Sequence, residues 1–227
     1  MQYLLWLFFL AALGNWLSVS KQWKRLEYLT KPAAILTLLA WLWSVSGFEG
    51  YLAWFAAGLA FSLAGDIFLV LPKERFIAAW LAFLSAHICY VIGLNPTFLP
   101  INLASLLLAV VVGLVAFRLV SVILRGLKSS GDTRLQAPII LYGFVISVML
   151  LSALLTLVRS NWFEGPALMV SAGAILFFVS DAALALNRFT APIRQGRLII
   201  MSTYHIGQAL IITGSFLHYA LLANSLR

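Results

Sequence analysis

Charged side chains are scarce in this chain. Of its 227 residues only 10% are Asp, Glu, Lys or Arg, whereas 63% are hydrophobic. A soluble domain of ordinary composition carries about a quarter charged residues. The shortage excludes an ordinary soluble protein, and it predicts an integral membrane protein with most of its mass in the bilayer.

Cysteine is nearly absent as well. The single cysteine, Cys89, cannot form an intramolecular disulfide. No linker is long enough to hold a separate soluble domain, so we expect residues 1–227 to form a single multi-pass membrane domain. The net charge of +8 comes from basic residues scattered among short connections, which indicates membrane topology and argues against a nucleic-acid partner.

Long apolar segments fill most of the chain. A membrane-spanning helix needs about 20 predominantly apolar residues, and prolines mark most of the breaks between such segments. The predicted spans are eight: 3–19, 32–48, 51–71, 76–94, 101–118, 138–158, 165–187 and 198–222. The first span lacks a basic region before it, so we interpret it as a retained helix and not as a signal peptide. The predicted fold is an all-α bundle of eight transmembrane helices.

Basic residues alternate between the two sides of this arrangement. Thirteen of the fifteen lie in the connections 20–31, 72–75, 118–137 and 188–197. Connections rich in Lys and Arg stay in the cytoplasm, so both termini are predicted on the non-cytoplasmic side. We expect the protein to lie in the cytoplasmic membrane of a bacterium.

Only two of the seven acidic residues, Asp66 and Asp181, lie inside long apolar segments. A charged side chain at the bilayer centre costs about 2.5–3.5 kcal/mol on insertion scales, so such residues are typically functional. Each is followed on the next span by a histidine, His87 after 21 residues and His205 after 24. This parallel between the two halves indicates a 4+4 parallel repeat.

These polar groups are expected at similar depths. The helical rise puts both aspartates about 7–8 Å from the cytoplasmic ends of their helices, His205 about 10 Å deep and His87 about 16 Å deep. The fourth and eighth spans also carry Tyr90, Tyr204 and Gln208. We therefore expect one polar cavity between the third, fourth, seventh and eighth spans. Such a cavity would suit acid–base chemistry on a lipid, a proton-coupled transporter of a small amphiphile, or a metal-dependent lipid hydrolase.

Five strings, in this order and spacing, resemble the YhhN family of eight-span membrane proteins, whose animal members are lysoplasmalogenases. They are Thr30-Lys31-Pro32, Gly65-Asp66-Ile67-Phe68-Leu69, Ala86-His87-Ile88-Cys89-Tyr90, Ser180-Asp181-Ala182-Ala183-Leu184-Ala185 and Thr203-Tyr204-His205-Ile206-Gly207-Gln208-Ala209-Leu210-Ile211. The chain departs from the family at His205, where a tyrosine is common, and this argues against a metal site built on that histidine.

The resemblance implies hydrolysis of the vinyl-ether bond of a lysoplasmalogen, with ethanolamine or choline in the head group, to a fatty aldehyde and the glycerophospho head group. It implies Asp66 and Asp181 as the catalytic carboxylates. Protonation of the vinyl ether gives an oxocarbenium ion that water captures, and two carboxyl groups can serve both steps, as in glycosidases. We expect no cofactor and no metal ligands, and the sequence leaves open whether a metal is bound.

Further polar residues are expected to assist. Those expected to orient water or relay protons are His87, Tyr90, Tyr204, His205 and Gln208. Those expected to bind the phosphate of the head group at the cytoplasmic face are Lys31, Arg75 and Arg188. The expected partners are the lysophospholipid, water and the surrounding membrane lipids. The sequence leaves open which aspartate is the acid, which head group is preferred and what the oligomeric state is.

Overall fold

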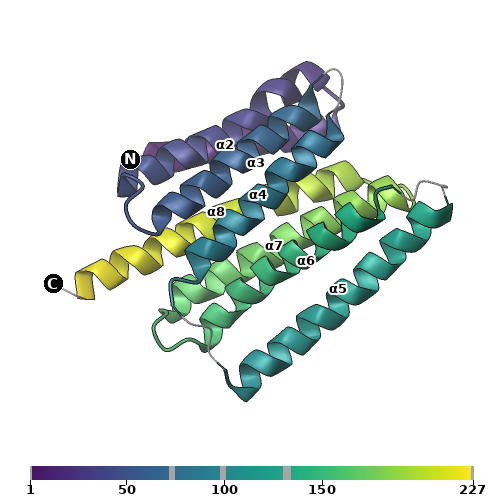
Figure 1. Ribbon diagram of the computed structural model, residues 1–227. Helices are drawn as coiled ribbons and strands as arrows, with labels where there is room; N and C mark the ends of the chain where they lie inside the picture. The colour runs from purple at the N-terminus through teal and green to yellow at the C-terminus, as the bar shows by residue number, and fades with distance from the viewer. Residues whose placement is uncertain (1, 72–74, 98–100, 130–133, 226–227) are drawn as a thin grey trace. The chain divides into compact units, whose positions relative to one another are not determined.

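The computed structural model describes residues 2–71, 75–97, 101–129 and 134–225, and these residues contain eight long α-helices and no strand (Figure 1). The helices are α1 Gln2–Ser20, α2 Lys24–Ser46, α3 Leu52–Val70, α4 Phe76–Leu94, α5 Leu103–Ser129, α6 Gln136–Leu155, α7 Glu164–Phe189 and α8 Gly196–Ser225, and a single 3₁₀ turn, η1 Thr156–Val158, follows α6. All eight are long and apolar enough to cross a membrane. The predicted all-α class with eight spans is confirmed, and the protein is a multi-pass membrane protein.

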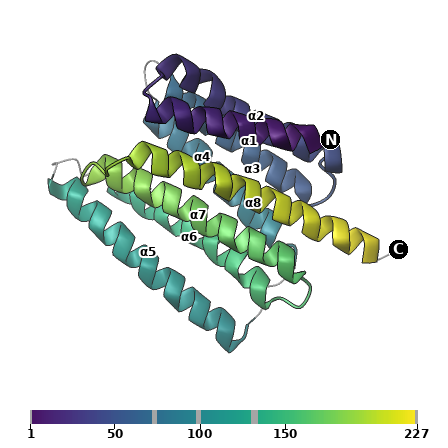
Figure 2. The ribbon, with the colours of Figure 1, turned by 180° about the vertical axis from the view of Figure 1, so that it is seen from behind.

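The chain divides into two compact units. The first comprises residues 1–96 and 212–227, and the second comprises residues 97–211. The first therefore holds α1 to α4 with the last part of α8, and the second holds α5 to α7 with the first part of α8. The 30-residue helix α8 contributes to both (Figure 2).

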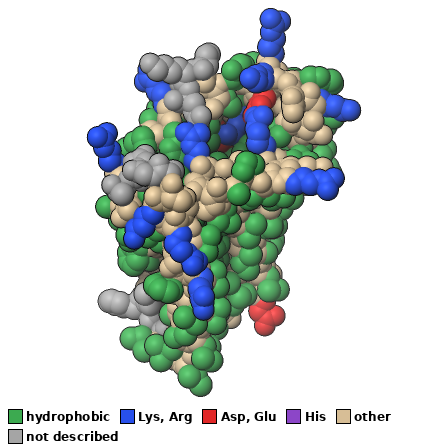
Figure 3. Space-filling view, turned by 90° about the vertical axis from the view of Figure 1, so that its right-hand side faces the viewer, with side chains coloured by type: hydrophobic (Ala, Val, Ile, Leu, Met, Phe, Trp, Pro, Cys, Tyr) green, Lys and Arg blue, Asp and Glu red, His purple; other side chains and the backbone are tan. Residues whose placement is uncertain are grey.

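Large hydrophobic side chains lie on the outer surface of the helices. Leu114 of α5 is 61% exposed and Phe144 of α6 is 66% exposed. In Figure 3 hydrophobic side chains cover much of the visible face. A helix that spans a bilayer contacts hydrocarbon, which is as apolar as these side chains, so their exposure is the expected state for a membrane protein.

In the first unit, glycines let α3 and α4 approach closely. A Cβ atom on Gly58 would lie 2.2 Å from the ring of Tyr90, and one on Gly65 would lie 2.7 Å from the ring of Phe83. Small residues at such positions allow neighbouring membrane helices to pack tightly. The two aromatic rings of α4 thus lie directly against the backbone of α3, and Gly65 immediately precedes Asp66.

In the second unit, α7 and α8 contact each other through their backbones. A Cβ atom on Gly173 would lie 2.8 Å from the carbonyl oxygen of Gly207, and one on Gly207 would lie 2.9 Å from the carbonyl oxygen of Gly173. About two turns further along α7, Ser180 Oγ donates a 2.9 Å hydrogen bond to the Ile200 carbonyl of α8. These contacts fix the part of α8 that carries Tyr204, His205 and Gln208.

Basic connections fall at one end of each unit. Consecutive helices joined by short connections run antiparallel, so in the first unit the α1–α2 and α3–α4 connections share an end. In the second unit the α5–α6 and α7–α8 connections share an end. These are the four connections in which the sequence concentrates Lys and Arg. Lys73, one of the basic residues counted there, lies outside the described residues.

Candidate active-site residues

Asp66 forms a buried ion pair in the first unit. Lys31 Nζ of α2 lies 3.3 Å from Asp66 Oδ1 of α3, and the two side chains are 4% and 1% exposed. Lys31 reaches this position because α2 begins at Lys24, seven residues before it, and continues through Pro32. Removing two charges from water is costly, so such a pair persists only where each charge compensates the other. Lys31 was expected at the phosphate of the head group; here its ammonium group balances Asp66.

His87 and Tyr90 are fully buried on α4 in the same unit. The ring of Tyr90 lies over Gly58 and stacks on Phe55 of α3, with ring centroids 5.9 Å apart. These contacts hold the Tyr90 ring in one place. A fixed ring is compatible with a hydroxyl group that takes part in catalysis and also with a residue that only packs in the core. Arg75 lies just before α4 and is exposed, where it could meet a phosphate at the membrane surface.

Asp181 has a partner that the sequence analysis did not identify. Tyr142 Oη of α6 donates a 2.5 Å hydrogen bond to Asp181 Oδ2 of α7, and both side chains are partly buried. The sequence does contain a signal for this contact, because the two residues lie at similar depths in their helices. Tyr142 follows Pro138 by four residues, or about 6 Å of helix, and Asp181 precedes Leu186 by five, or about 7–8 Å. Because α6 and α7 run antiparallel, both distances are measured from the same end of the unit, and the two side chains lie at similar depth.

The polar residues of α8 in the second unit are also buried. Tyr204, His205 and Gln208 are at most 2% exposed. Tyr204 packs edge-on against Phe177 of α7 with ring centroids 5.4 Å apart, and its ring lies 5.3 Å from that of His205. Gly207, which lies between His205 and Gln208 on α8, packs directly against the backbone of α7.

The predicted residues thus fall into two groups that are described separately. In the first unit Asp66 is joined to Lys31, with His87 and Tyr90 buried on the neighbouring helix. In the second unit Asp181 is joined to Tyr142. Arg188, in the last turn of α7, is exposed like Arg75. Among the described residues no three His, Cys, Asp or Glu side chains gather into a set that could hold a metal ion.

Comparison with known proteins identifies the family. The sequence model described as the YhhN family matches residues 26–215, a range that includes every predicted site residue. The chain belongs to the YhhN family. Human lysoplasmalogenase TMEM86B is 31% identical to it over 183 residues, which make up 81% of this chain and 72% of the human protein. The membrane protein YhhN of Escherichia coli O157:H7 is 28% identical over 225 residues, covering 94% of this chain and 100% of that protein.

Bovine lysoplasmalogenase TMEM86A is a third relative of this YhhN-family chain, 31% identical over 157 residues, or 68% of this chain and 61% of the bovine protein. No solved structure matches the chain.

Proposed function

We propose that this YhhN-family protein is a lysoplasmalogenase, which hydrolyses the vinyl-ether bond of lysoplasmalogens to a fatty aldehyde and the glycerophospho head group. The observation that carries the proposal is the pair of buried or partly buried aspartates with partners of different charge, in a membrane chain whose relatives include named lysoplasmalogenases. A lipid substrate is consistent with carboxyl groups placed inside membrane-spanning helices.

The reaction needs an acid and a stabilising negative charge. The acid places a proton on the β-carbon of the vinyl ether, which consumes the C=C double bond and leaves an oxocarbenium ion. Water adds to the cationic carbon and gives up a proton to a base. The hemiacetal then collapses to the aldehyde and the free hydroxyl of the head group, so that one water is consumed and the acid regains its proton.

Asp66 is assigned the stabilising charge. Its ion pair with Lys31 is buried. The ammonium group of Lys31 compensates the Asp66 carboxylate, and removing one partner of a buried pair costs about 3–5 kcal/mol. A carboxylate held in a buried ion pair is a fixed negative charge, and it can stabilise an oxocarbenium ion through the whole reaction.

Asp181 is assigned the acid and, after water attack, the base. Its partner Tyr142 is a neutral phenol. A hydroxyl group can donate to a carboxylate or accept from a carboxylic acid, so Tyr142 can hold Asp181 in one orientation in both protonation states. Tyr142 is therefore proposed as a positioning residue.

The remaining predicted residues keep supporting roles in this proposal. Arg75 and Arg188 are exposed at the connections α3–α4 and α7–α8, and they are the proposed phosphate ligands. Those proposed to orient water or relay protons are His87, Tyr90, Tyr204, His205 and Gln208.

The test uses the purified full chain in detergent with lysoplasmenylethanolamine and lysoplasmenylcholine, with fatty aldehyde as the readout. In D₂O the aldehyde should carry one deuterium on the carbon next to the carbonyl, because that carbon receives the catalytic proton. Asp181→Asn should lower the rate by about 10²–10⁴-fold, the usual contribution of a general acid. The double variant Lys31→Gln/Asp66→Asn removes the second carboxylate without leaving a buried charge, and it should also be inactive.

Glu164→Gln is the matched control, since Glu164 is an exposed carboxylate at the start of α7, and it should keep full activity. Loss of activity with a chelator would favour the metal-dependent mechanism. If folded wild-type protein released no aldehyde from either substrate, the proposal would be wrong. Uptake driven by a pH gradient in proteoliposomes would then test the transporter alternative.

A further inference from the structure

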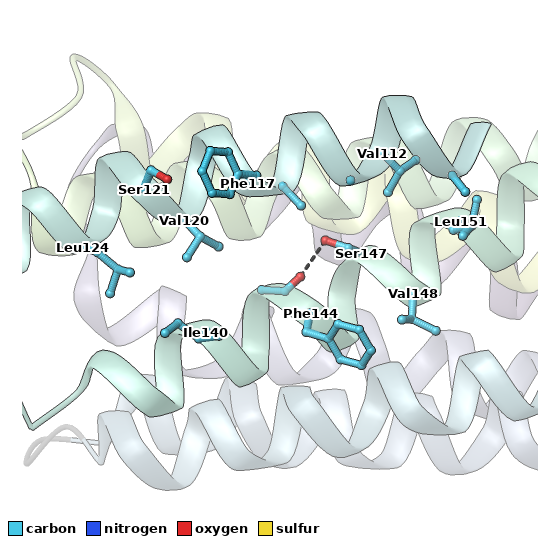
Figure 4. Close-up of a pocket in the computed structure, with 14 residues that line it drawn as sticks. Val112, Phe117, Val120, Ser121, Leu124, Ile140, Phe144, Ser147, Val148 and Leu151 are labelled. Carbon is cyan, nitrogen blue, oxygen red and sulfur yellow. Dashed lines mark hydrogen bonds between the residues drawn. The ribbon is translucent and has the colours of Figure 1, made fainter. Parts of the chain in front are cut away.

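An apolar groove runs between α5 and α6 within the second unit. It has a volume of about 500 Å³ and is lined by fourteen residues, of which only Ser121 and Ser147 have hydroxyl groups (Figure 4). Ser147 Oγ donates its hydrogen bond to the Gly143 carbonyl of its own helix. The walls therefore present hydrocarbon, from side chains such as Val112, Val120 and Phe144.

The groove is separate from the proposed catalytic groups. Its α6 wall includes Ile140, Phe144 and Val148, which repeat every four residues and so share one face of the helix. At 3.6 residues per turn, Tyr142 lies on the opposite face, where it donates its hydrogen bond to Asp181 of α7. A ligand in the groove would contact the other side of α6, away from Asp181.

A positive charge lies at one end of the groove. Arg125 Nε donates a 3.3 Å hydrogen bond to the carbonyl oxygen of Ser121, and Ser121 lines the groove. The guanidinium group is thereby drawn back along α5 towards the groove, and the side chain remains exposed. All charged side chains of α5, namely Arg118, Arg125 and Lys128, lie in the C-terminal half of the helix. The opposite end of the groove, near Ala109, has no charge on α5.

The groove is long enough to hold a lipid chain. On α5 it extends from Ala109 to Leu124, which corresponds to about 22 Å of helix. The hydrocarbon of one bilayer leaflet is about 15 Å thick. One alkyl chain can therefore lie along the groove with its polar end at Arg125. Arginine binds phosphate oxygens in a planar, two-pronged geometry, which makes it the residue type most often used for phosphate recognition.

We propose that this groove binds an anionic diacyl phospholipid, with one alkyl chain between α5 and α6 and the phosphate on Arg125. The lipid would fill the space beside α5, a helix that contacts little of the rest of the protein. Only 11% of an apolar 18-residue stretch of α5 is buried. The lipid therefore joins α5 to α6 and stabilises the second unit.

The test measures phosphatidylglycerol retained by the purified full chain, by native mass spectrometry, and the thermal unfolding of the same protein with added lipid. Wild-type protein should retain one phosphatidylglycerol, and added phosphatidylglycerol should raise its Tm more than phosphatidylcholine does. Gly113→Phe fills the groove, because a Cβ atom on Gly113 meets nothing within 4 Å. This variant should retain no lipid and show no Tm shift. Arg125→Gln should weaken retention about tenfold, as expected for the loss of one charge-assisted contact.

Two control variants distinguish binding in the groove from general effects of added bulk or lost charge. Leu114→Phe enlarges the adjacent, lipid-facing position of the same helix, and Arg194→Gln removes an exposed cation from the α7–α8 connection; both should behave as wild type. The proposal fails if phosphatidylcholine is bound equally well, or if retention survives in both Gly113→Phe and Arg125→Gln. It also fails if Gly113→Phe converts a dimer into a monomer, because the occupant of the groove would then be a second copy of the chain.

Discussion

At the scale of single residues, the Lys31–Asp66 pair behaves as one unit, because each charge is buried and compensated by the other. The pair affects the free energy of unfolding mainly through the cost of leaving one charge buried without its partner, and less through the attraction between the two charges. Replacing both members of a buried ion pair with neutral residues is often tolerated, whereas removing one leaves a buried charge.

We therefore expect Lys31→Met to destabilise the protein by about 3–5 kcal/mol, and Lys31→Gln/Asp66→Asn to recover most of that loss. Unfolding of the purified protein in detergent measures both, and Lys21→Met, which alters an exposed lysine, is the control. Equal destabilisation in the single and double variants would show that the two charges do not depend on each other.

Tyr142 provides the second prediction at this scale. In Tyr142→Phe, Asp181 loses the hydroxyl group that orients it, so kcat for aldehyde release should fall by about 10–100-fold, the size of effect known for partners that orient metal-ligating side chains, while KM changes little. Tyr219→Phe is the matched control, because the Tyr219 hydroxyl also donates a hydrogen bond, to the Gly93 carbonyl, and Tyr219 belongs to the first unit whereas Asp181 belongs to the second. A loss confined to KM, or an equal loss in Tyr219→Phe, would contradict the positioning role.

The sequence identifies the two aspartates inside apolar segments but not the residues that contact them. Asp66 and Asp181 stand out because acids are rare in apolar segments. Their partners do not stand out: Tyr142 is one of seven tyrosines, and it lies 39 residues before Asp181. Lys31 was placed at the membrane surface because Pro32 was expected to begin the helix. The structure instead begins α2 at Lys24, which carries Lys31 about 10 Å along the helix.

At the scale of elements, hydropathy locates apolar segments and not helix ends. The apolar segment expected to cross the membrane ends at Arg118, whereas α5 continues to Ser129. A helix satisfies its own backbone hydrogen bonds and therefore need not end where the bilayer does. The extra turns carry Arg125 and Lys128. Hydropathy therefore missed the part of α5 that holds Arg125, on which the proposed lipid site depends.

The α7–α8 contact gives the prediction at this scale. In Gly207→Ala the new methyl group would lie 2.9 Å from backbone atoms of Gly173 and Phe177, and backbone cannot move aside as a flexible side chain can. Overpacking of this kind costs about 1–3 kcal/mol, and it should also lower aldehyde release because Gly207 lies between His205 and Gln208. Gly165→Ala is the control, since nothing lies within 4 Å of its Cβ position. Thermal unfolding in detergent compares the two, and equal Tm values would contradict the close contact.

At the scale of the whole molecule, charge and helix order lead to one topology. Each unit gathers its basic connections at a single end, although hydropathy does not distinguish positive from negative charge. Connections rich in Lys and Arg remain in the cytoplasm, so the rule orients each unit independently of the other. Eight spans were predictable because each apolar segment is long enough by itself. The 4+4 parallel repeat stays a prediction, since it concerns a relation between the halves.

The topology prediction can be tested with single cysteines in a Cys89→Ala background, which removes the buried native thiol. Ser129→Cys and Gln195→Cys lie at the basic ends of the second unit, and both native side chains are exposed. In intact bacterial cells an impermeant thiol reagent should label neither until the membrane is opened. Glu49→Cys and Ser160→Cys, exposed in the α2–α3 and α6–α7 connections, should react at once. The predicted topology places both termini on the same side as the α2–α3 and α6–α7 connections, so the reverse labelling pattern would place the termini in the cytoplasm. It would also turn the Arg75 and Arg188 end of the helices away from the cytoplasm, so that the proposed phosphate ligands would meet substrate from the outer leaflet.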